Sequence, residues 1–275
     1  MAEPIRILFA IPKLDSGGPD RVFHEIICGL DRKVFAPQLV VSVQGGCYFS
    51  ALPDDVETCV IDGGRYPLRR FAKAVDRLRP DLVFSTLRMN ATAAAARLFQ
   101  RHRPPIIARQ ANAFAVNFKE LKKSSLLKYQ FAEIVVGWLL KLPVALVAQS
   151  KDMASELEKY AKLSQEVVTI GNPVSLADLE KRRALEPSAS CDSPWGQPAI
   201  VAVGRLEKQK GFDLLLSAFA QLLHSFPSAR LSIWGEGSQR DSLVTLCKSL
   251  NISGVVRFPG TTEAVLNEVS SAELL

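Results

Sequence analysis

Short apolar runs alternate with stretches of helical spacing along most of the chain. In its first part, strand-like runs rich in Val, Ile, Leu and Phe occupy residues 5–11, 37–43, 56–61, 81–86, 105–110, 144–150 and 166–170. Several of the stretches between them, such as 20–30 and 151–161, repeat apolar residues with the period of a helix. Strands and helices that alternate in this way form parallel sheets covered by helices. The pattern therefore predicts an α/β fold with a parallel sheet.

The alternation breaks once and then restarts. Residues 172–198 are rich in proline, serine and charge, as is typical of a connection between domains. Beyond them the pattern predicts strands at 199–204, 229–235 and 255–258, with helices at 213–226 and 238–250. We therefore expect an N-terminal domain at 1–175, a connection at 176–197 and a second domain at 198–275. About three strands are few for an open sheet, and the sequence stops within an apolar pattern, so the second domain is expected to be incomplete.

Composition narrows the class of protein only moderately. The 275 residues are 48% hydrophobic and carry a net charge of +6. This charge favours anionic partners such as phosphorylated molecules, nucleic acid or an acidic membrane, but an ordinary basic surface explains it equally well. The basic residues are dispersed without interleaved aromatic residues, which argues against nucleic acid. Five scattered cysteines and three histidines give no disulfide framework and no zinc signature, so we expect a cytoplasmic protein with reduced thiols.

A charged turn follows the strand at 199–204. The sequence VGRLEKQKGFD places Arg205, Lys210 and Gly211 between this strand and a predicted helix. Open α/β sheets bind ligands at the carboxyl ends of their strands. There Arg205 can offer a planar fork of donors, Lys210 a compact positive charge and Gly211 a tight entry into the helix. The turn is suited to a phosphate or diphosphate, while two ordinary loop charges remain the alternative.

A glycine pair occupies the corresponding position after the first strand. Gly17 and Gly18 precede a predicted helix and would let a ligand approach the backbone, although a simple flexible turn explains them as well. The G-x-G-x-x-G fingerprint is absent, and no acidic residue ends the second strand where a ribose would need one. These absences argue against a nicotinamide-dependent oxidoreductase. With the turn at Arg205 and Lys210, the pair suggests a cleft in which a diphosphate bridges two domains.

These motifs together resemble those of the retaining glycosyltransferases of family 4. Six of them occur in family order and spacing over almost the whole chain: Gly17-Gly18 with Arg21, Ser150, Asn172-Pro173-Val174, Val203 to Phe212, Gly235-Glu236-Gly237, and Val256 to Gly260. The resemblance implies the GT-B architecture of two facing Rossmann-like domains. It also implies transfer of a sugar from a nucleotide-sugar, most commonly a UDP-sugar, to a hydroxyl acceptor with retention of configuration. Such acceptors belong to glycan, polysaccharide or glycolipid biosynthesis.

The resemblance also assigns roles to individual residues. Arg205 and Lys210 match the basic pair that binds the donor diphosphate and stabilises the leaving group, and they are the expected catalytic residues. The donor-binding residues implied are Gly17, Gly18, Arg205, Lys210, Gly235 and Arg257. Neither a metal ion nor another cofactor is implied.

Two departures from the family pattern bear on these expectations. The family's E-x7-E motif, which binds the donor sugar and ribose, would follow a segment like SSAELL, and the sequence ends at Leu275 before it. A truncated, inactive transferase-like binding protein is therefore the alternative function. Many family members also have a histidine after the strand matched by 105–110, where this chain has RQANAF. Arg109 and Asn112 are the candidates for acceptor contacts.

One segment with basic and apolar residues bears on where in the cell the protein lies. Lys119, Lys122, Lys123 and Lys128 precede an apolar run that contains Trp138. Such a segment can lie on an anionic membrane surface, which fits a lipid-linked acceptor, or it can pack its apolar stripe on the sheet. We expect a cytoplasmic protein, and a peripheral contact with the cytoplasmic face of the membrane stays open.

Overall fold

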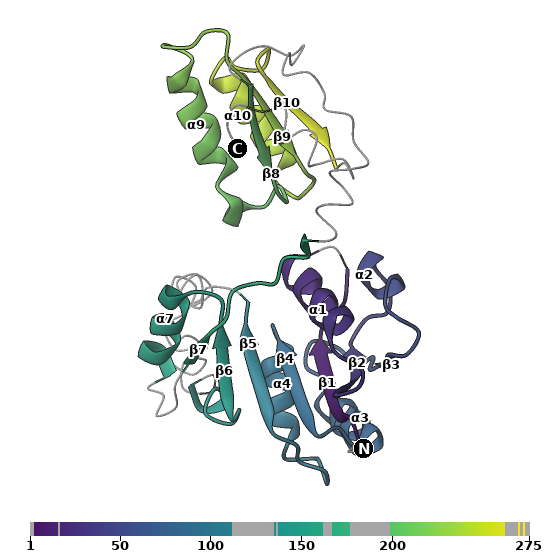
Figure 1. Cartoon of the computed structure of the whole chain (residues 1–275). Coiled ribbons are helices and arrows are strands. Elements are labelled where there is room, and N and C mark those ends of the chain that lie inside the picture. The colour runs from purple at the N-terminus through teal and green to yellow at the C-terminus, as the bar shows by residue number, and fades with distance from the viewer. Residues whose placement is uncertain are drawn as a thin grey trace. The chain divides into compact units, whose positions relative to one another are not determined.

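The chain divides into two compact units, Met1–Val174 and Ser175–Leu275. The structure, a computed structural model, describes residues 3–15, 17–111, 135, 137–161, 167–176, 199–261, 269 and 272. Each unit has its own parallel sheet (Figure 1). Each also has its own cluster of buried apolar side chains. The predicted α/β fold with parallel sheets is thereby confirmed.

The sheet of the first unit has seven parallel strands. These are β1 (Ile5–Ile11), β2 (Phe35–Val41), β3 (Glu57–Val60), β4 (Leu82–Thr86), β5 (Ile106–Gln110), β6 (Ala145–Ala148) and β7 (Val167–Thr169). Their order is β3-β2-β1-β4-β5-β6-β7, so the direction in which strands are added reverses between β1 and β4. In open α/β sheets, ligands bind at the carboxyl ends of the strands beside such a reversal. We call this side of each sheet its carboxyl edge and the opposite side its amino edge.

Helices pack on the two faces of this sheet. They are α1 (Gly18–Gly29), α2 (Cys47–Ser50), α3 (Leu68–Leu78), α4 (Met89–Ala96) and α7 (Lys151–Ala161). Alternate residues of β1 point to opposite faces: Phe9 packs in a cluster with Phe23 of α1, and Leu8 in a cluster with Phe71 of α3. The Phe23 ring also stacks on Phe84 of β4 with centroids 5.2 Å apart. This packing fixes the start of α1, and with it the glycine pair, beside the strand reversal.

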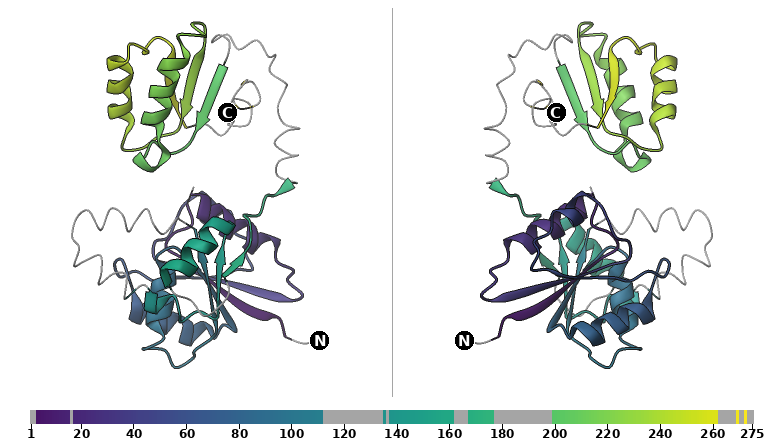
Figure 2. Two further views of the ribbon diagram at one scale, coloured as in Figure 1. Left: turned by 90° about the vertical axis from the view of Figure 1, so that its left-hand side faces the viewer. Right: turned by 90° about the vertical axis from the view of Figure 1, so that its right-hand side faces the viewer.

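The second unit contains a smaller sheet with helices on one side. Its strands are β8 (Ala199–Val203), β9 (Arg230–Trp234) and β10 (Val256–Gly260), in the parallel order β10-β9-β8. The described helices are α9 (Phe212–Leu222) and α10 (Arg240–Ser249), preceded by the 3-10 turn η1 (Lys208–Lys210). Figure 2 shows α9 and α10 on the same side of the sheet, where Leu216 and Leu243 join Leu231 in one buried cluster.

The observed elements differ from the predicted ones mainly at their ends. Strand β2 begins at Phe35 rather than at residue 37, and α9 ends at Leu222 rather than at residue 226. The short elements α2 and η1 were not predicted, because single turns have too little periodicity to be detected. The basic and apolar segment from Lys119 to Trp138 lies mostly outside the described residues, as does most of the predicted connection. Among the described residues, no helix combines the length and apolarity that a membrane span requires.

Candidate functional site

The turn that carries Arg205 and Lys210 lies at the carboxyl edge of the second unit. Strand β8 ends at Val203, η1 carries Lys210, and Gly211 takes a left-handed φ of 67° before α9 begins. Both cationic side chains are exposed. The stem of Lys210 folds back toward the strand, since its Cδ and Cε lie 3.8 Å from where a Cβ on Gly204 would be. A cation is thereby held close to the end of β8.

Backbone hydrogen bonds join this turn to the loop after β9. The Gly204 N–H donates to the Trp234 carbonyl and the Leu206 N–H to the Glu236 carbonyl, each at 2.9 Å. The Leu206 carbonyl in turn accepts from the Gln239 N–H at 2.9 Å. Backbone groups paired in this way fix the path of the turn from both sides. The backbone that carries Arg205 and Lys210 is therefore held in a defined conformation.

The carboxylate of Glu207 also joins the turn after β8 to the loop after β9. Glu207 accepts hydrogen bonds from the N–H of Ser238 at 3.2 Å and from its hydroxyl at 2.9 Å. These two bonds favour the ionised form and hold the pKa of Glu207 below its ordinary value. Because Glu207 lies between Arg205 and Lys210, this contact stabilises the turn at its centre.

The glycines after β9 are required by close backbone packing. Gly235 has a φ of 140°, and a Cβ there would lie 1.9 Å from the carbonyl oxygen of Gly204. A Cβ on Gly237 would lie 2.4 Å from the carbonyl oxygen of Leu206. The structure thus gives Gly235 a packing role, and its predicted contact with the donor stays a prediction.

Arg257 lies along the sheet of the second unit. It is the second residue of β10, three positions before the strand ends at Gly260, and it is in register with Ser232 of β9. Its Nε donates to the hydroxyl of Ser232, itself buried, at 2.7 Å. The sequence did not predict this partner. A contact between Arg257 and a nucleotide base stays a prediction.

In the first unit, Gly17 and Gly18 differ from each other in their surroundings. The buried carboxylate of Asp20 accepts hydrogen bonds from the N–H groups of Gly17 and Asp15, both at 3.1 Å. The N–H of Gly17 is therefore already used within the chain. Gly18 begins α1, and a Cβ placed there would meet nothing within 4 Å. Of the two predicted glycines, Gly18 leaves open space beside the start of the helix.

Arg109 is buried at the carboxyl edge of the first unit, near the end of β5. The residue is only 3% exposed. Its Nη2 donates hydrogen bonds to Asn172 Oδ1 at 2.5 Å and to Gln149 Oε1 at 3.4 Å. Its Nη1 is buried and has no hydrogen-bond partner in the described part of the chain. Burial lowers the pKa of Arg109 below its ordinary value.

The main chain of Arg109 is held as firmly as its side chain. Its carbonyl oxygen accepts from the hydroxyl of Thr86 at 3.1 Å and from the amide of Asn90 at 3.0 Å. Polar side chains from four neighbouring segments therefore meet at this edge. The other predicted acceptor residue, Asn112, lies outside the described residues.

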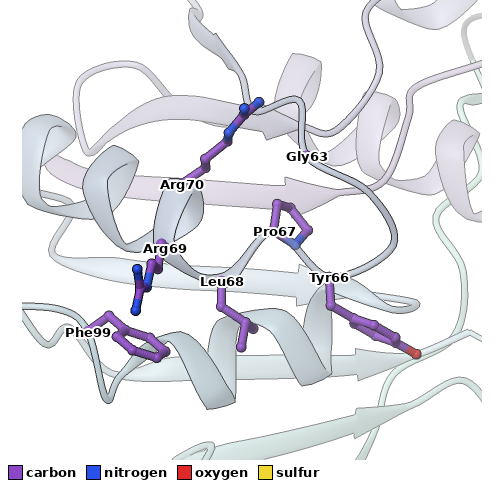
Figure 3. A pocket seen from close by; sticks show the side chains of 7 residues that line it. All are labelled: Gly63, Tyr66, Pro67, Leu68, Arg69, Arg70 and Phe99. Carbon is purple, nitrogen blue, oxygen red and sulfur yellow. The ribbon is translucent and has the colours of Figure 1, made fainter.

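A separate surface pocket of about 330 Å³ opens beside the start of α3. Its lining consists of Gly63, Tyr66, Pro67, Leu68, Arg69, Arg70 and Phe99 (Figure 3). The guanidinium of Arg69 lies 5.6 Å from the centroid of the Phe99 ring. None of the residues predicted from the sequence lines this pocket.

Metal binding was not expected from the sequence. Within the described ranges, no group of three or more His, Cys, Asp or Glu side chains could hold a metal ion. That the reaction needs no metal stays a prediction.

The match to a family model concerns the second unit. Residues 189–275 match the family model "Glycosyl transferases group 1". This range includes the turn with Arg205 and Lys210, as well as Gly235 and Arg257. The candidates of the first unit lie outside it.

Two curated relatives are glycosyl-transferring enzymes by name. The chain is 39% identical over 72 residues to the lipopolysaccharide core biosynthesis glycosyltransferase LpsE of Rhizobium meliloti, which is 26% of this chain and 20% of that protein. It is 28% identical over 127 residues to a glycogen synthase of Mycobacterium tuberculosis, which is 46% of this chain and 29% of that protein. The chain thus spans less than a third of the length of these relatives.

Similarity of fold extends over both units. The crystal structure of Anabaena HepE in complex with UDP and glucose matches with a TM-score of 0.71 and 16% identity, covering 98% of this chain and 73% of that one. At this level of identity the likeness concerns the fold. The family match and the named relatives together support a transferase, and the segment that carries Arg205 and Lys210 is similar to the group 1 glycosyl transferases.

Proposed function

We propose that this chain carries out retaining transfer of a sugar from a UDP-sugar to a hydroxyl acceptor, in the biosynthesis of lipopolysaccharide or a related glycan. The observation that carries the proposal is the turn after β8, where Arg205 and Lys210 lie exposed on a main chain fixed by the loop after β9. The same residues lie in the segment similar to the group 1 glycosyl transferases.

The chemistry of the leaving group explains why two cations are useful there. As the bond between sugar and diphosphate breaks, negative charge grows on the diphosphate oxygens. Donors held in place beforehand stabilise this charge without reorganisation during the reaction. Arg205 can bind two oxygens with its planar fork, and Lys210 can place a compact charge on a third. The contact between Glu207 and Ser238 supports this role, because it holds the turn between the two cations.

The identity of the donor rests on similarity. HepE, which shares the fold, was crystallised with UDP and glucose, and UDP-sugars are therefore the first donors to test. The space beside Gly18 would admit part of either substrate close to the backbone. Retention of configuration rests on the resemblance in sequence. A cytoplasmic location, with an acceptor that is lipid-linked and reached at the membrane, remains part of the proposal.

Binding of UDP to the purified chain tests the donor site. We expect calorimetric titration to detect binding, and Lys210→Ala to weaken it by about tenfold or more, since a charge-assisted contact is lost. Lys248→Ala is the matched control, because Lys248 is an exposed lysine of the same unit, at the end of α10. Equal affinities for the Lys210→Ala and Lys248→Ala variants would contradict the assignment.

Turnover separates an enzyme from a binding protein. We expect the intact protein to release UDP from a UDP-sugar in the presence of an acceptor, with the anomeric configuration of the donor kept in the product, as read by NMR. An inverted product would contradict retention. Binding of UDP without turnover of any UDP-sugar would favour the alternative of a transferase-like binding protein.

A further inference from the structure

At the carboxyl edge of the first unit lies a buried positive charge that has no negative partner among the described residues. Arg109 is only 3% exposed, and the two oxygens that accept from its Nη2 belong to the neutral amides of Asn172 and Gln149. No ion pair to Arg109 occurs among the residues the structure describes. Burial lowers the pKa of Arg109, and no carboxylate among the described residues counteracts this.

A buried guanidinium without a counter-charge is an unusual arrangement. Taking an ion out of water is costly, and buried charges in proteins are generally paired. Arg109 retains an unused donor as well, because its Nη1 is buried without a hydrogen-bond partner in the described part of the chain. Among the residues the structure describes, nothing uses this charge or this hydrogen bond.

The position of Arg109 indicates a ligand rather than a structural defect. It lies on β5, next to β4, at the edge where the order of strands reverses and where open α/β sheets bind their ligands. A second arginine, Arg88, follows β4 at the same edge, two residues after Thr86, the register partner of Arg109. The Nε of Arg88 is also buried without a partner in the described residues. Two guanidinium groups with unused donors thus belong to neighbouring strand ends.

We propose that Arg109 binds an oxyanion of the acceptor substrate, a phosphate or a carboxylate, and that this enzyme therefore glycosylates an acidic acceptor. The inference rests on the proposed function, which assigns the donor diphosphate to Arg205 and Lys210 and leaves the charge of the first unit to the other substrate. Arg109 selects the acceptor by charge, and Asn172 and Gln149 hold its guanidinium in place.

Inorganic phosphate serves as the first probe, with glucuronate as the carboxylate probe. Both are titrated at constant ionic strength into the full chain carrying Arg205→Ala and Lys210→Ala, so that the proposed donor cations do not contribute. We expect phosphate, glucuronate or both to raise the melting temperature of this double variant. Adding Arg109→Gln should weaken that binding by about ten- to a hundredfold. Adding Arg101→Gln instead, an exposed arginine between α4 and β5, should leave it unchanged.

An isosteric variant keeps the test valid if Arg109→Gln fails to fold. Asn172→Asp places a carboxylate where an amide oxygen now lies 2.5 Å from Arg109 Nη2, and so supplies the missing counter-charge from within the chain. We expect this variant to melt at a higher temperature than wild type without phosphate and to lose the response to phosphate. Unchanged melting together with an unchanged phosphate response would overturn the proposal.

The outcomes also separate this proposal from that of the donor site. If Arg109→Gln in the otherwise wild-type chain abolishes binding of UDP, Arg109 belongs to the donor diphosphate and the acceptor assignment is wrong. If the folded Arg109→Gln variant melts at a lower temperature yet responds to phosphate as the Arg101→Gln control does, Arg109 only braces Asn172. Failure of UDP to bind the wild-type chain refutes the donor site and leaves the phosphate result at Arg109 to be judged by itself.

Discussion

Two of the turns that contain glycine, at Gly17-Gly18 in the first unit and at Gly235–Gly237 in the second, differ in the reason for their glycines. In the second unit, a side chain at Gly235 would collide with the carbonyl oxygen of Gly204, 1.9 Å from its Cβ, and one at Gly237 would collide with Leu206. In the first unit, a Cβ at Gly18 would meet nothing within 4 Å. Glycine is demanded by packing in one turn and leaves free space in the other.

This difference bears on how each unit would hold its ligand. In the second unit, the glycines let two loops join through their backbones, and the joined loops carry exposed cations. In the first unit, the backbone leaves space beside Gly18, and the cation at the same edge, Arg109, is buried and held by side-chain amides. We infer that the carboxyl edge of the second unit depends on its fixed main chain. The carboxyl edge of the first unit depends instead on open space beside a buried charge.

Replacement of Gly235 should have the largest effect. Gly235→Ala adds a methyl group against a carbonyl oxygen at a φ of 140°, which side chains rarely adopt. We expect the free energy of unfolding of the second unit to fall by about 3 kcal/mol, as measured by chemical denaturation. Gly18→Ala is the matched control and should leave stability unchanged within about 1 kcal/mol. Equal losses in the two variants would show that the two turns do not differ in the way described.

Replacement of Lys210 should mainly affect turnover. In the intact enzyme, Lys210→Ala leaves the joined loops in place and removes one cation from the developing charge of the diphosphate. We expect kcat to fall by about a hundredfold, the scale of one preorganised electrostatic contact, with little change in melting temperature. Steady-state kinetics beside Lys248→Ala provide the measurement. A large loss of stability with unchanged kcat would assign Lys210 to structure.

Filling the space beside Gly18 should have a smaller effect. Gly18→Val places a branched side chain at the first position of α1, where a Cβ would meet nothing within 4 Å. We expect substrate affinity to fall by several-fold while the melting temperature stays close to that of wild type. Titration with UDP and with phosphate would show which substrate uses the space. Unchanged affinity for both would mean that Gly18 is only a turn residue.

The pattern of apolar residues predicted the fold well because it reports on burial. Strand β1 was predicted with its observed ends, since Leu8 and Phe9 alternate between two buried clusters. Helix α7 was also predicted at its observed length. The turn η1 was missed, because three residues have no detectable period. The position of Lys210 relative to the strand therefore became visible only in the structure.

The candidate sites were less accessible to sequence reasoning. The motif around Lys210 could be located, because its residues are consecutive. The state of Arg109 depends on Gln149 and Asn172, which lie 40 and 63 residues further along the chain. Its burial and its contacts with two neutral amides arise where these distant segments meet, and no local pattern in the sequence reports them. The same holds for the pairing of Arg257 with Ser232, 25 residues apart.

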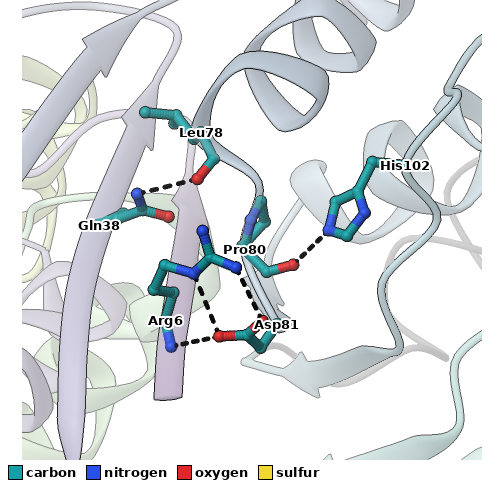
Figure 4. Close-up of polar contacts among 6 residues, drawn as sticks. All are labelled: Arg6, Gln38, Leu78, Pro80, Asp81 and His102. Atoms are coloured by element: carbon teal, nitrogen blue, oxygen red, sulfur yellow. Dashed lines mark hydrogen bonds and ion pairs between the residues drawn. The ribbon is translucent and has the colours of Figure 1, made fainter. Parts of the chain in front are cut away.

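The smallest expected effect concerns Arg6, at the amino edge of the first unit. Unlike Arg109, this arginine has a carboxylate partner. At the amino edge, Arg6 is exposed and forms an ion pair with Asp81, its Nη2 3.1 Å from Asp81 Oδ1 (Figure 4). Asp81 Oδ2 also accepts from Arg6 Nε at 3.2 Å and from the Arg6 N–H at 2.9 Å. The Arg6 side chain is the main reason that the pKa of Asp81 lies below its ordinary value, with the Arg6 backbone N–H next. The positive charge of Arg6 is thus already paired with the carboxylate of Asp81.

Asp81→Asn should therefore change stability slightly and ligand binding not at all. Because the pKa of Asp81 is lowered on folding, the pair stabilises the protein above the carboxyl's ordinary pKa of about 4 and loses this effect as the pH falls through the lowered value. We expect the variant to melt slightly lower than wild type at pH 7, since exposed pairs contribute little, and the gap to narrow in high salt and in acid. Thermal melts from pH 7 downward measure this gap. A changed response to phosphate in this variant would mean that the two edges are coupled, and the contrast between Arg6 and Arg109 would then no longer separate a structural charge from a ligand-binding one.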